Sequence, residues 1–265
     1  MTPRALLLHD ETGQLWPADG ADCGDIVSAY QIALAVRALR QARGERPRGY
    51  KVGFTNRTIW PRYKVFAPVW GTVWDTTLSW SEAAQPGTLS LSRLCQPRIE
   101  PEAVFGFKAT PARGAGLDEL FEALDWIAPG FEIVQSHLPD WKFVAAQTVA
   151  DNGLHARLHV GPRVAVTDLA RGADGLQRRL AAARVSLLCG DETVDTGTGA
   201  QVLDSPLHAL LHFLNELRAC PGATDIAPGD VVTTGTWTDA WPVAPGQTWS
   251  SAHDDVLPPL SLRLA

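Results

Sequence analysis

The stretch Gln96-Pro97-Arg98-Ile99-Glu100-Pro101-Glu102-Ala103-Val104-Phe105 places two carboxylates two residues apart, just before an apolar run. Side chains of a β-strand alternate between its faces, so a strand here points Glu100 and Glu102 to one side and Pro101 to the other. Two like charges on one face repel and raise each other's pKa unless a cation lies between them. Paired carboxylates suit Mg²⁺. The stretch therefore predicts either an ordinary charged strand face or part of a metal site.

A third carboxylate and a lysine lie in similar apolar segments. Glu132 follows a Pro-Gly turn signal in the segment 129–134. Lys51 lies in the short extended segment 50–54. Lysine is rarely buried without a partner, and burial lowers its pKa toward values useful in acid–base catalysis. The alternative for Lys51 is an edge-strand side chain whose ammonium reaches water.

Composition excludes several classes of protein. With 265 residues, 45% of them hydrophobic, the chain is long enough for one large or two small domains. A net charge of -6 and the lack of a Lys/Arg-rich block argue against nucleic acid and anionic membranes as partners. The apolar run near the N-terminus is too short for a signal peptide. Four scattered cysteines are typical of reduced thiols, so we expect a cytoplasmic protein: Cys23, Cys95, Cys189 and Cys220.

Hydrophobic periodicity predicts an α+β chain. The predicted helices cover residues 25–43, 116–127, where the helix ends at the turn 128–130, and 206–219. The predicted strands cover residues 154–160, 185–189, 192–196, 231–236 and 260–264. In the predicted strand at 154–160, His155 and His159 share a face, and a structural role is the favoured interpretation of both. Asp75 ends a short β-like run, where aspartate is usually a turn or cap residue and a catalytic role is the alternative.

Eight segments, taken in order, resemble the fumarylacetoacetate hydrolase superfamily, and most closely its 2-keto-4-pentenoate hydratase / 4-oxalocrotonate decarboxylase branch. The resemblance runs from about residue 29 to residue 248. No single segment decides it, but the ordered set is specific to the branch. The segments are AYQIALAVRALR, GYKVGFT, WGTVWD, PRIEPEAVF, PGFEIVQSHLPDWKF, TVADNG, TGTGAQVLDSPLHALLHFLNEL and IAPGDVVTTGTWTDAWPVAPGQT.

The resemblance implies a fold and a set of site residues. The fold is a mixed β-sheet domain of the fumarylacetoacetate hydrolase type, a β-roll or sandwich, over residues 79–265, with a partly helical N-terminal segment over residues 1–78 packed on it. A divalent metal, Mg²⁺ or Mn²⁺, is implied at the carboxylates described above. Lys51 matches the family's active-site lysine, and Asp75 matches an acidic residue near it. For the metal, the resemblance implies Glu100, Glu102 and Glu132. For the substrate, it implies Lys142 and Asn152, which lie in segments that approach the pocket in relatives.

The implied chemistry starts from a small-molecule 2-oxo or 2-hydroxy-dienoate acid whose 1-carboxylate and 2-oxygen bind the metal, which stabilises an enolate. A hydratase is the first expectation and a 4-oxalocrotonate-type decarboxylase the second. A hydrolase of C–C bonds in diketo acids and a non-catalytic relative are further alternatives, and fold does not choose among them. The resemblance also implies a homo-oligomer, associated with a partner enzyme of the same pathway.

The chain departs from the family pattern at two places. Gly153-Leu154 replaces Ala-Ser after Asp151-Asn152, so a serine hydroxyl is missing, and Ser136-His137 replaces Ser-Arg. In addition, the segments 58–70 and 237–241 are rich in Trp. Because Trp lines pockets for flat apolar ligands, we expect a larger or more aromatic pocket than the commonest hydratases need, able to bind aryl-substituted 2-oxo acids.

Overall fold

The computed structural model describes residues 1–17, 22–81 and 86–265. The helices are α1 (Pro3–Thr12), α2 (Ile26–Ala42), η1 (Arg57–Ile59), α3 (Trp60–Tyr63), α4 (Leu117–Ala123), η2 (Pro139–Trp141), α5 (Ala145–Ala150), η3 (Asn152–Leu154), α6 (Val166–Leu169), α7 (Ala173–Ala182), η4 (Gly199–Gln201) and α8 (Pro206–Ala219). The strands are β1 (Pro47–Gly53), β2 (Val69–Trp74), β3 (Leu78–Trp80), β4 (Gly87–Leu89), β5 (Arg98–Phe107), β6 (Leu124–Val134), β7 (His155–Val160), β8 (Val164–Ala165), β9 (Arg184–Cys189), β10 (Glu192–Thr198), β11 (Val231–Thr233), β12 (Trp241–Pro242), β13 (Thr248–His253) and β14 (Leu257–Leu264).

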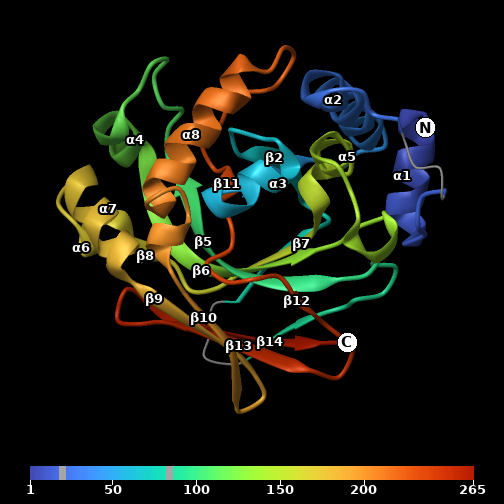
Figure 1. Cartoon of the computed structure of the whole chain (residues 1–265). Coiled ribbons are helices and arrows are strands. Elements are labelled where there is room, and N and C mark those ends of the chain that lie inside the picture. The colour runs from blue at the N-terminus through green and yellow to red at the C-terminus, as the bar shows by residue number, and fades with distance from the viewer. Residues whose placement is uncertain (18–21, 82–85) are drawn as a thin grey trace.

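Two mixed sheets form the body of the protein, which confirms the expected α+β fold. Within the described residues, nine strands form the larger sheet, in the order β2-β1-β11-β5-β6-β7-β3, with β12 beside β5 and β8 beside β6. Five strands form the smaller sheet, in the order β10-β9-β13-β14-β4. In Figure 1 the smaller sheet lies below the larger sheet, and most helices lie above the larger sheet. The long strands β5 and β6 therefore run through the middle of the molecule.

Buried apolar side chains fill the spaces on both sides of the larger sheet. Between the two sheets, Ile99 of β5 and Phe131 of β6 pack with Trp249 and Leu262 of the smaller sheet. On the helical side, Phe213 of α8 belongs to the largest apolar cluster. Because Ile99 faces the smaller sheet, the alternation of β5 directs its neighbours Arg98 and Glu100 to the other face.

Several local predictions are confirmed, and caps explain where the helices begin. Asp25 accepts a hydrogen bond from the Ser28 amide at the start of α2, and Ser205 accepts one from the His208 amide at the start of α8. The predicted hairpin is the pair β9–β10. No helix among the described residues is both long and apolar enough to span a bilayer.

The predicted helix over residues 116–127 is confirmed as far as α4 extends, but its last residues and the turn predicted at residues 128–130 are wrong. The helix α4 ends at Ala123, and Leu124 already belongs to β6, which continues through Pro129 to Val134. Pro129 is tolerated because it lies between the part of β6 that pairs with β8 and the part, from Gly130 onward, that pairs with β7. Here pairing with β5 outweighs the local helical pattern.

The division of the chain at residue 78 stays a prediction. The strands β1 and β2, from the N-terminal segment, belong to the same sheet as β5, β6 and β11. The segment is therefore joined to the rest by β1, which pairs in parallel with β11, as well as by its helices.

Candidate metal centre and active-site cavity

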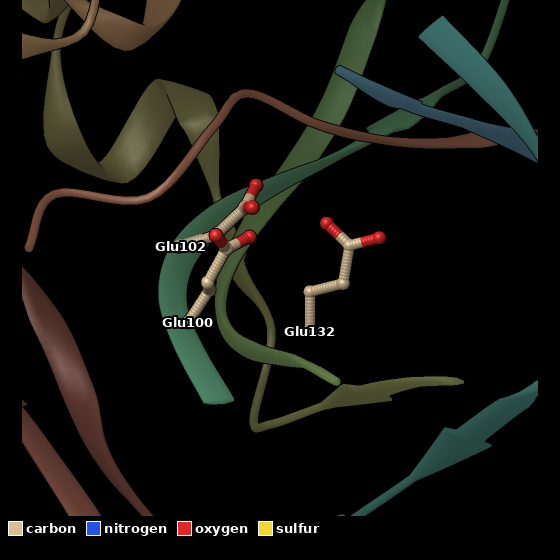
Figure 2. Close-up of side chains that lie close together, drawn as sticks. All are labelled: Glu100, Glu102 and Glu132. Atoms are coloured by element: carbon tan, nitrogen blue, oxygen red, sulfur yellow. The ribbon is translucent and has the colours of Figure 1, made fainter. Parts of the chain in front are cut away.

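Three carboxylates from two neighbouring strands meet at the centre of the larger sheet. Glu100 and Glu102 share one face of β5, as the two-residue repeat predicts. The antiparallel register of β5 and β6 places Glu132 directly opposite Glu100. One oxygen from each of the three side chains lies within 4.8 Å of the others. Figure 2 shows the carboxyl groups of Glu100 and Glu102 together and that of Glu132 facing the same space.

Burial makes this cluster unfavourable without a positive charge inside it. Glu102 and Glu132 are fully buried, and burial is the largest cause that raises the pKa of all three carboxyls. The charge of Glu132 adds to the rise for the other two, and the pKa of Glu100 reaches about 8. Buried carboxylates this close together are stabilised by a cation between them.

The donor set fits a hard divalent cation. Glu102 Oε2 accepts a hydrogen bond of 2.7 Å from the Gly235 amide, while its Oε1 is buried and has no hydrogen-bond partner among the described residues. Gly235 has φ 95°, and a Cβ there would lie 1.9 Å from Thr55 Oγ1, so the tight approach to Glu102 requires glycine. An all-oxygen set with an unpartnered buried oxygen matches the ligands of Mg²⁺ or Mn²⁺.

Lys51 lies beside the carboxylates and is buried, so the alternative of a lysine that reaches water is wrong. Its Nζ donates a hydrogen bond of 2.8 Å to the Gly153 carbonyl oxygen and forms an ion pair of 3.2 Å with Glu132 Oε2. Burial lowers the pKa of Lys51, but the charges of the three glutamates outweigh it and raise the pKa overall. The expected lowering is thus reversed by the neighbouring anions.

The turn η3 presents the carbonyl that Lys51 binds. Asn152, Gly153 and Leu154 all have positive φ, at 52°, 65° and 67°, and such a run is unusual, above all for leucine. Asn152 holds the turn in place: its side chain accepts from the Thr72 amide at 2.8 Å and donates to the Thr72 carbonyl at 3.0 Å. Asn152 therefore clamps η3 to β2 and lies outside the cavity lining, whereas Gly153 and Leu154 line it.

His155 orients Glu132 and was missed as a site residue. Its Nδ1 lies 2.8 Å from Glu132 Oε1, and its Nε2 lies 2.9 Å from Thr77 Oγ1. Burial and the charge of Lys51 hold the pKa of His155 well below its usual range, so the neutral ring donates from Nδ1 to Glu132 and accepts from Thr77. The signal in the sequence for this role is the position of His155 at the start of β7, the strand that pairs with the strand of Glu132.

A cavity of about 630 Å³ opens beside Lys51 and Glu100. One side of it is an aromatic wall of Trp141, Phe143, Tyr63 and Phe54, whose successive ring centroids lie 6.2, 5.5 and 5.0 Å apart. Residues of the loop before β12 and of β12 itself also line the cavity, where Trp241 Nε1 donates to Asp195 Oδ2 at 2.8 Å. The cavity is thus rich in aromatic rings and has the charged groups Lys51 and Glu100 in its lining.

The structure does not bring Asp75 and Lys142 into this cavity. Asp75 is exposed, and its Oδ1 accepts from the Arg46 amide at 3.0 Å, which is the ordinary turn role of such an aspartate. The side chain of Lys142 is 81% exposed and pairs with Asp140 at 3.2 Å. For Lys142 the neighbours decide the outcome, because Trp141 and Phe143, on either side of it, line the cavity instead.

Of the two tryptophan-rich segments, 237–241 contributes Trp237 and Trp241 to the cavity lining, whereas the tryptophans of the segment 58–70 do not line it. Trp70 and Trp74 are buried core residues, and Trp60 Nε1 donates to the Phe54 carbonyl. The tryptophans that line the cavity are Trp141, Trp237 and Trp241. Binding of aryl-substituted 2-oxo acids stays a prediction.

Comparison with known proteins finds hydratases and decarboxylases as relatives. No protein-family model matches the sequence. The chain is 30% identical over 223 residues to a 2-hydroxyhexa-2,4-dienoate hydratase of Comamonas testosteroni, which covers 83% of this chain and 80% of that protein. It is 30% identical over 221 residues to a 4-oxalocrotonate decarboxylase of Pseudomonas sp. strain CF600, with coverage of 82% and 78%.

Solved structures agree with these relatives. A 4-oxalocrotonate decarboxylase from Pseudomonas putida G7, complexed with magnesium and adipate, matches with a TM-score of 0.87 and 25% identity over 99% of this chain and 95% of that one. A fumarylpyruvate hydrolase from Pseudomonas aeruginosa, in complex with Mn²⁺ and pyruvate, matches with a TM-score of 0.63 and 18% identity over 82% of this chain and 89% of that one. At 18% identity, the second match supports a shared fold and nothing more.

Proposed function

This chain belongs to the fumarylacetoacetate hydrolase family, in the branch of the 2-keto-4-pentenoate hydratases and 4-oxalocrotonate decarboxylases, and from that premise we propose that it is a divalent-metal-dependent lyase acting on a 2-oxo or 2-hydroxy-dienoate acid. The first reaction we propose is the addition of water to the distal double bond. The observation that carries this proposal is the buried cluster of Glu100, Glu102 and Glu132 beside Lys51, at the inner end of a cavity.

The three glutamates would hold the cation. A Mg²⁺ or Mn²⁺ ion bound there supplies Lewis-acid stabilisation of the negative charge that develops on the substrate's 2-oxygen. Solved relatives contain magnesium, calcium or manganese, which supports a divalent ion here. His155 keeps Glu132 in a fixed orientation, since it holds one carboxylate oxygen while Lys51 pairs with the other.

Lys51 is the group we propose to move protons. An ammonium carries three N–H donors, and the Gly153 carbonyl and Glu132 account for two of them, which leaves one for the substrate. The aromatic wall lines the space that the carbon chain of the substrate would occupy. In hydration, Lys51 would hand a proton to the carbon skeleton as the 2-hydroxy-dienoate becomes a ketone. Asp75 is no part of this proposal, because its side chain lies outside the cavity.

Decarboxylation is the second candidate, favoured by one observation. The 4-oxalocrotonate decarboxylase of Pseudomonas putida G7 matches over 99% of this chain with a TM-score of 0.87, so the whole architecture is compatible with that activity. Lys51 would then protonate the carbon from which CO₂ departs. The same residues support either reaction.

One assay tests both candidates. The protein, with Mg²⁺ or Mn²⁺, is offered 2-hydroxypenta-2,4-dienoate and 4-oxalocrotonate in parallel, while dienol absorbance and released CO₂ are followed. Turnover of the dienoate without CO₂ identifies a hydratase, and CO₂ from 4-oxalocrotonate identifies a decarboxylase. Lys51→Met is expected to lower turnover about 100-fold or more and to leave metal binding in place. Inactivity on both substrates with metal bound would refute the proposed substrates.

A homo-oligomeric state, association with a partner enzyme and a cytoplasmic location stay predictions.

A further inference from the structure

A buried histidine–aspartate pair lies beside the turn η3, outside the metal centre. The Nδ1 atom of His137 lies 2.7 Å from Asp151 Oδ1, and the His137 amide donates to Asp151 Oδ2 at 3.1 Å. His137 is fully buried and Asp151 is 9% exposed. Both oxygens of this carboxylate therefore bind one residue, and neither member of the pair lines the active-site cavity.

This pair joins the chain that leaves β6 to η3. Asp151 directly precedes η3, whose last residue Leu154 donates its amide to the Asp151 carbonyl at 2.8 Å. The amide of Gln135, two residues before His137, donates to the Leu154 carbonyl at 2.9 Å. The segment after β6 is thus bonded to both ends of the turn, and the Gly153 carbonyl lies between these two attachments in the sequence.

The position of η3 matters because Lys51 depends on it. Lys51 Nζ donates to the Gly153 carbonyl at 2.8 Å, and all three residues of the turn have positive φ. A backbone of this kind persists only where the surrounding contacts hold it. Asn152 bonds the turn to β2, and the His137–Asp151 pair bonds it to the segment after β6. Weakening either support should therefore move the partner of Lys51.

The surroundings of His137 favour its charged form. Burial lowers its pKa and is the largest single effect. The charge of Asp151 and the hydrogen bond to it, with the charge of Asp10 and the backbone of His9 in α1, together outweigh burial and raise the pKa overall. The ring also stacks on Trp16, with 6.3 Å between the ring centroids. Because the pKa is raised, the ion pair is present below the ordinary histidine value of about 6.5 and is lost as the pH rises through the raised value.

Other titratable groups lie near Asp151 but do not replace His137. They are Arg37 and Arg40 of α2 and the thiols of Cys23 and Cys95. Arg40 already pairs with two carboxylates, and Arg37 donates to a tyrosine hydroxyl. Burial raises the pKa of both thiols, so they are uncharged at neutral pH. In the described part of the chain, His137 is thus the one cation that forms an ion pair with Asp151.

We propose that His137 and Asp151 are positioning residues for Lys51: as a charged pair they hold η3 where its carbonyl meets the ammonium, and turnover slows when the ring loses its proton. The inference rests on the proposed function, in which Lys51 moves protons. A neutral ring keeps a hydrogen bond to Asp151 but loses the attraction between the two charges, and we expect kcat to fall about fivefold on that account.

Turnover as a function of pH tests the proposal. The Mg²⁺-loaded protein is assayed from about pH 6 to about pH 9.5, on either side of the raised value, with whichever of 2-hydroxypenta-2,4-dienoate and 4-oxalocrotonate it turns over. NMR follows the His137 ring in the same protein. The wild-type kcat should fall as this ring loses its proton. His137→Gln, uncharged at every pH, should show the low kcat throughout, and His137→Arg, which stays charged, should keep the high kcat where the wild type falls.

Amide hydrogen exchange tests the support of η3 without substrate. The amides of Gln135 and Leu154 bond to the turn or within it, so they should exchange faster in His137→Gln than in the wild type or His137→Arg at the same pH. His212→Gln, at an exposed position of α8, is the matched control and should change neither the exchange nor the pH profile. Melting temperatures show which variants fold.

Three results would overturn the proposal. They are a His137→Gln variant with the wild-type profile and exchange, a folded His137→Arg variant that loses activity over the same pH range as the wild type, and a wild-type kcat that does not follow the ring. If His137→Gln does not fold, the wild type and His137→Arg decide. A wild type inactive on both substrates would contradict the proposed function instead, and exchange alone would then show whether the pair holds η3.

Discussion

Glu102→Gln should make the metal-free protein more stable while it destroys the metal site. Glu102 is fully buried, and its ligand oxygen lies within 4.8 Å of those of Glu100 and Glu132. At that separation, with an effective dielectric constant of about 20, two full charges repel by about 3.5 kcal/mol. Protonation already relieves part of this repulsion at pH 7. We therefore expect the free energy of unfolding of the metal-free variant to rise by about 1–3 kcal/mol.

The same substitution removes a ligand oxygen. The glutamine carbonyl can keep the hydrogen bond from the Gly235 amide, which directs the amide NH₂ of the new side chain toward the metal position. Because loss of a supporting partner alone costs about 10–100-fold in metal affinity, loss of a ligand should cost at least about 100-fold. At a metal concentration 100 times its Kd, the wild type gains about 2.7 kcal/mol of stability, and the variant should gain almost none.

Two titrations measure the effect. Calorimetry with Mn²⁺ gives the affinity, and thermal unfolding with and without Mn²⁺ gives the stability, at about 2–4 °C per kcal/mol for a chain of this size. Glu122→Gln, at an exposed position of α4, is the matched control and should change neither quantity. A Glu102→Gln variant with wild-type Mn²⁺ affinity, or one less stable than the wild type without metal, would refute the reasoning about the carboxylate cluster.

Two further predictions concern buried or clamped polar side chains. Asn152→Ala removes both hydrogen bonds to Thr72 and leaves a non-glycine residue at φ 52°, so the free energy of unfolding should fall by about 2–4 kcal/mol. Thermal unfolding measures this, with Asn215→Ala at an exposed position as the control that should change little. An Asn152→Ala variant as stable as the wild type would contradict the clamp. His253 is fully buried and lacks a hydrogen-bond partner among the described residues, and burial lowers its pKa to about 4. As the pH falls, the unfolded chain therefore protonates this histidine before the folded chain does, and this should lower the free energy of unfolding by about 3 kcal/mol between pH 6.5 and pH 4. Urea unfolding of His253→Phe across that range should show a correspondingly shallower loss, and an identical pH profile would contradict the assignment.

The part of the site that could be predicted is the part encoded by the two-residue repeat of one strand. That Glu100 and Glu102 share a face follows from local geometry alone. Glu132 could be proposed as a third ligand from the resemblance, but its place opposite Glu100 depends on the register of β5 and β6, which no local pattern specifies. His155 was missed for the same reason, because its contact with Glu132 arises from strand pairing.

The predictions that failed involve residues whose direction is set by tertiary contacts. Lys51 lies on β1 and turns inward to the Gly153 carbonyl, whereas Asp75 follows the end of the paired strand β2 and accepts from the Arg46 amide. The segment 124–130 has helical periodicity and a Pro-Gly signal. It nevertheless forms a strand, because it pairs with β5 and leads into Phe131, which packs in the core between the sheets. Long-range pairing therefore overrides the local preference there.

The arrangement on β5 also explains why one strand can fix the relative positions of charged groups in the site. Arg98, Glu100 and Glu102 follow one another on one face at a constant spacing, while Ile99 anchors the opposite face in the core between the sheets. A shift of β5 by one residue would move all three charged groups into that apolar core, so the burial that stabilises the fold also holds the cation site and the guanidinium at a set separation. A site on flexible loops would lack this constraint.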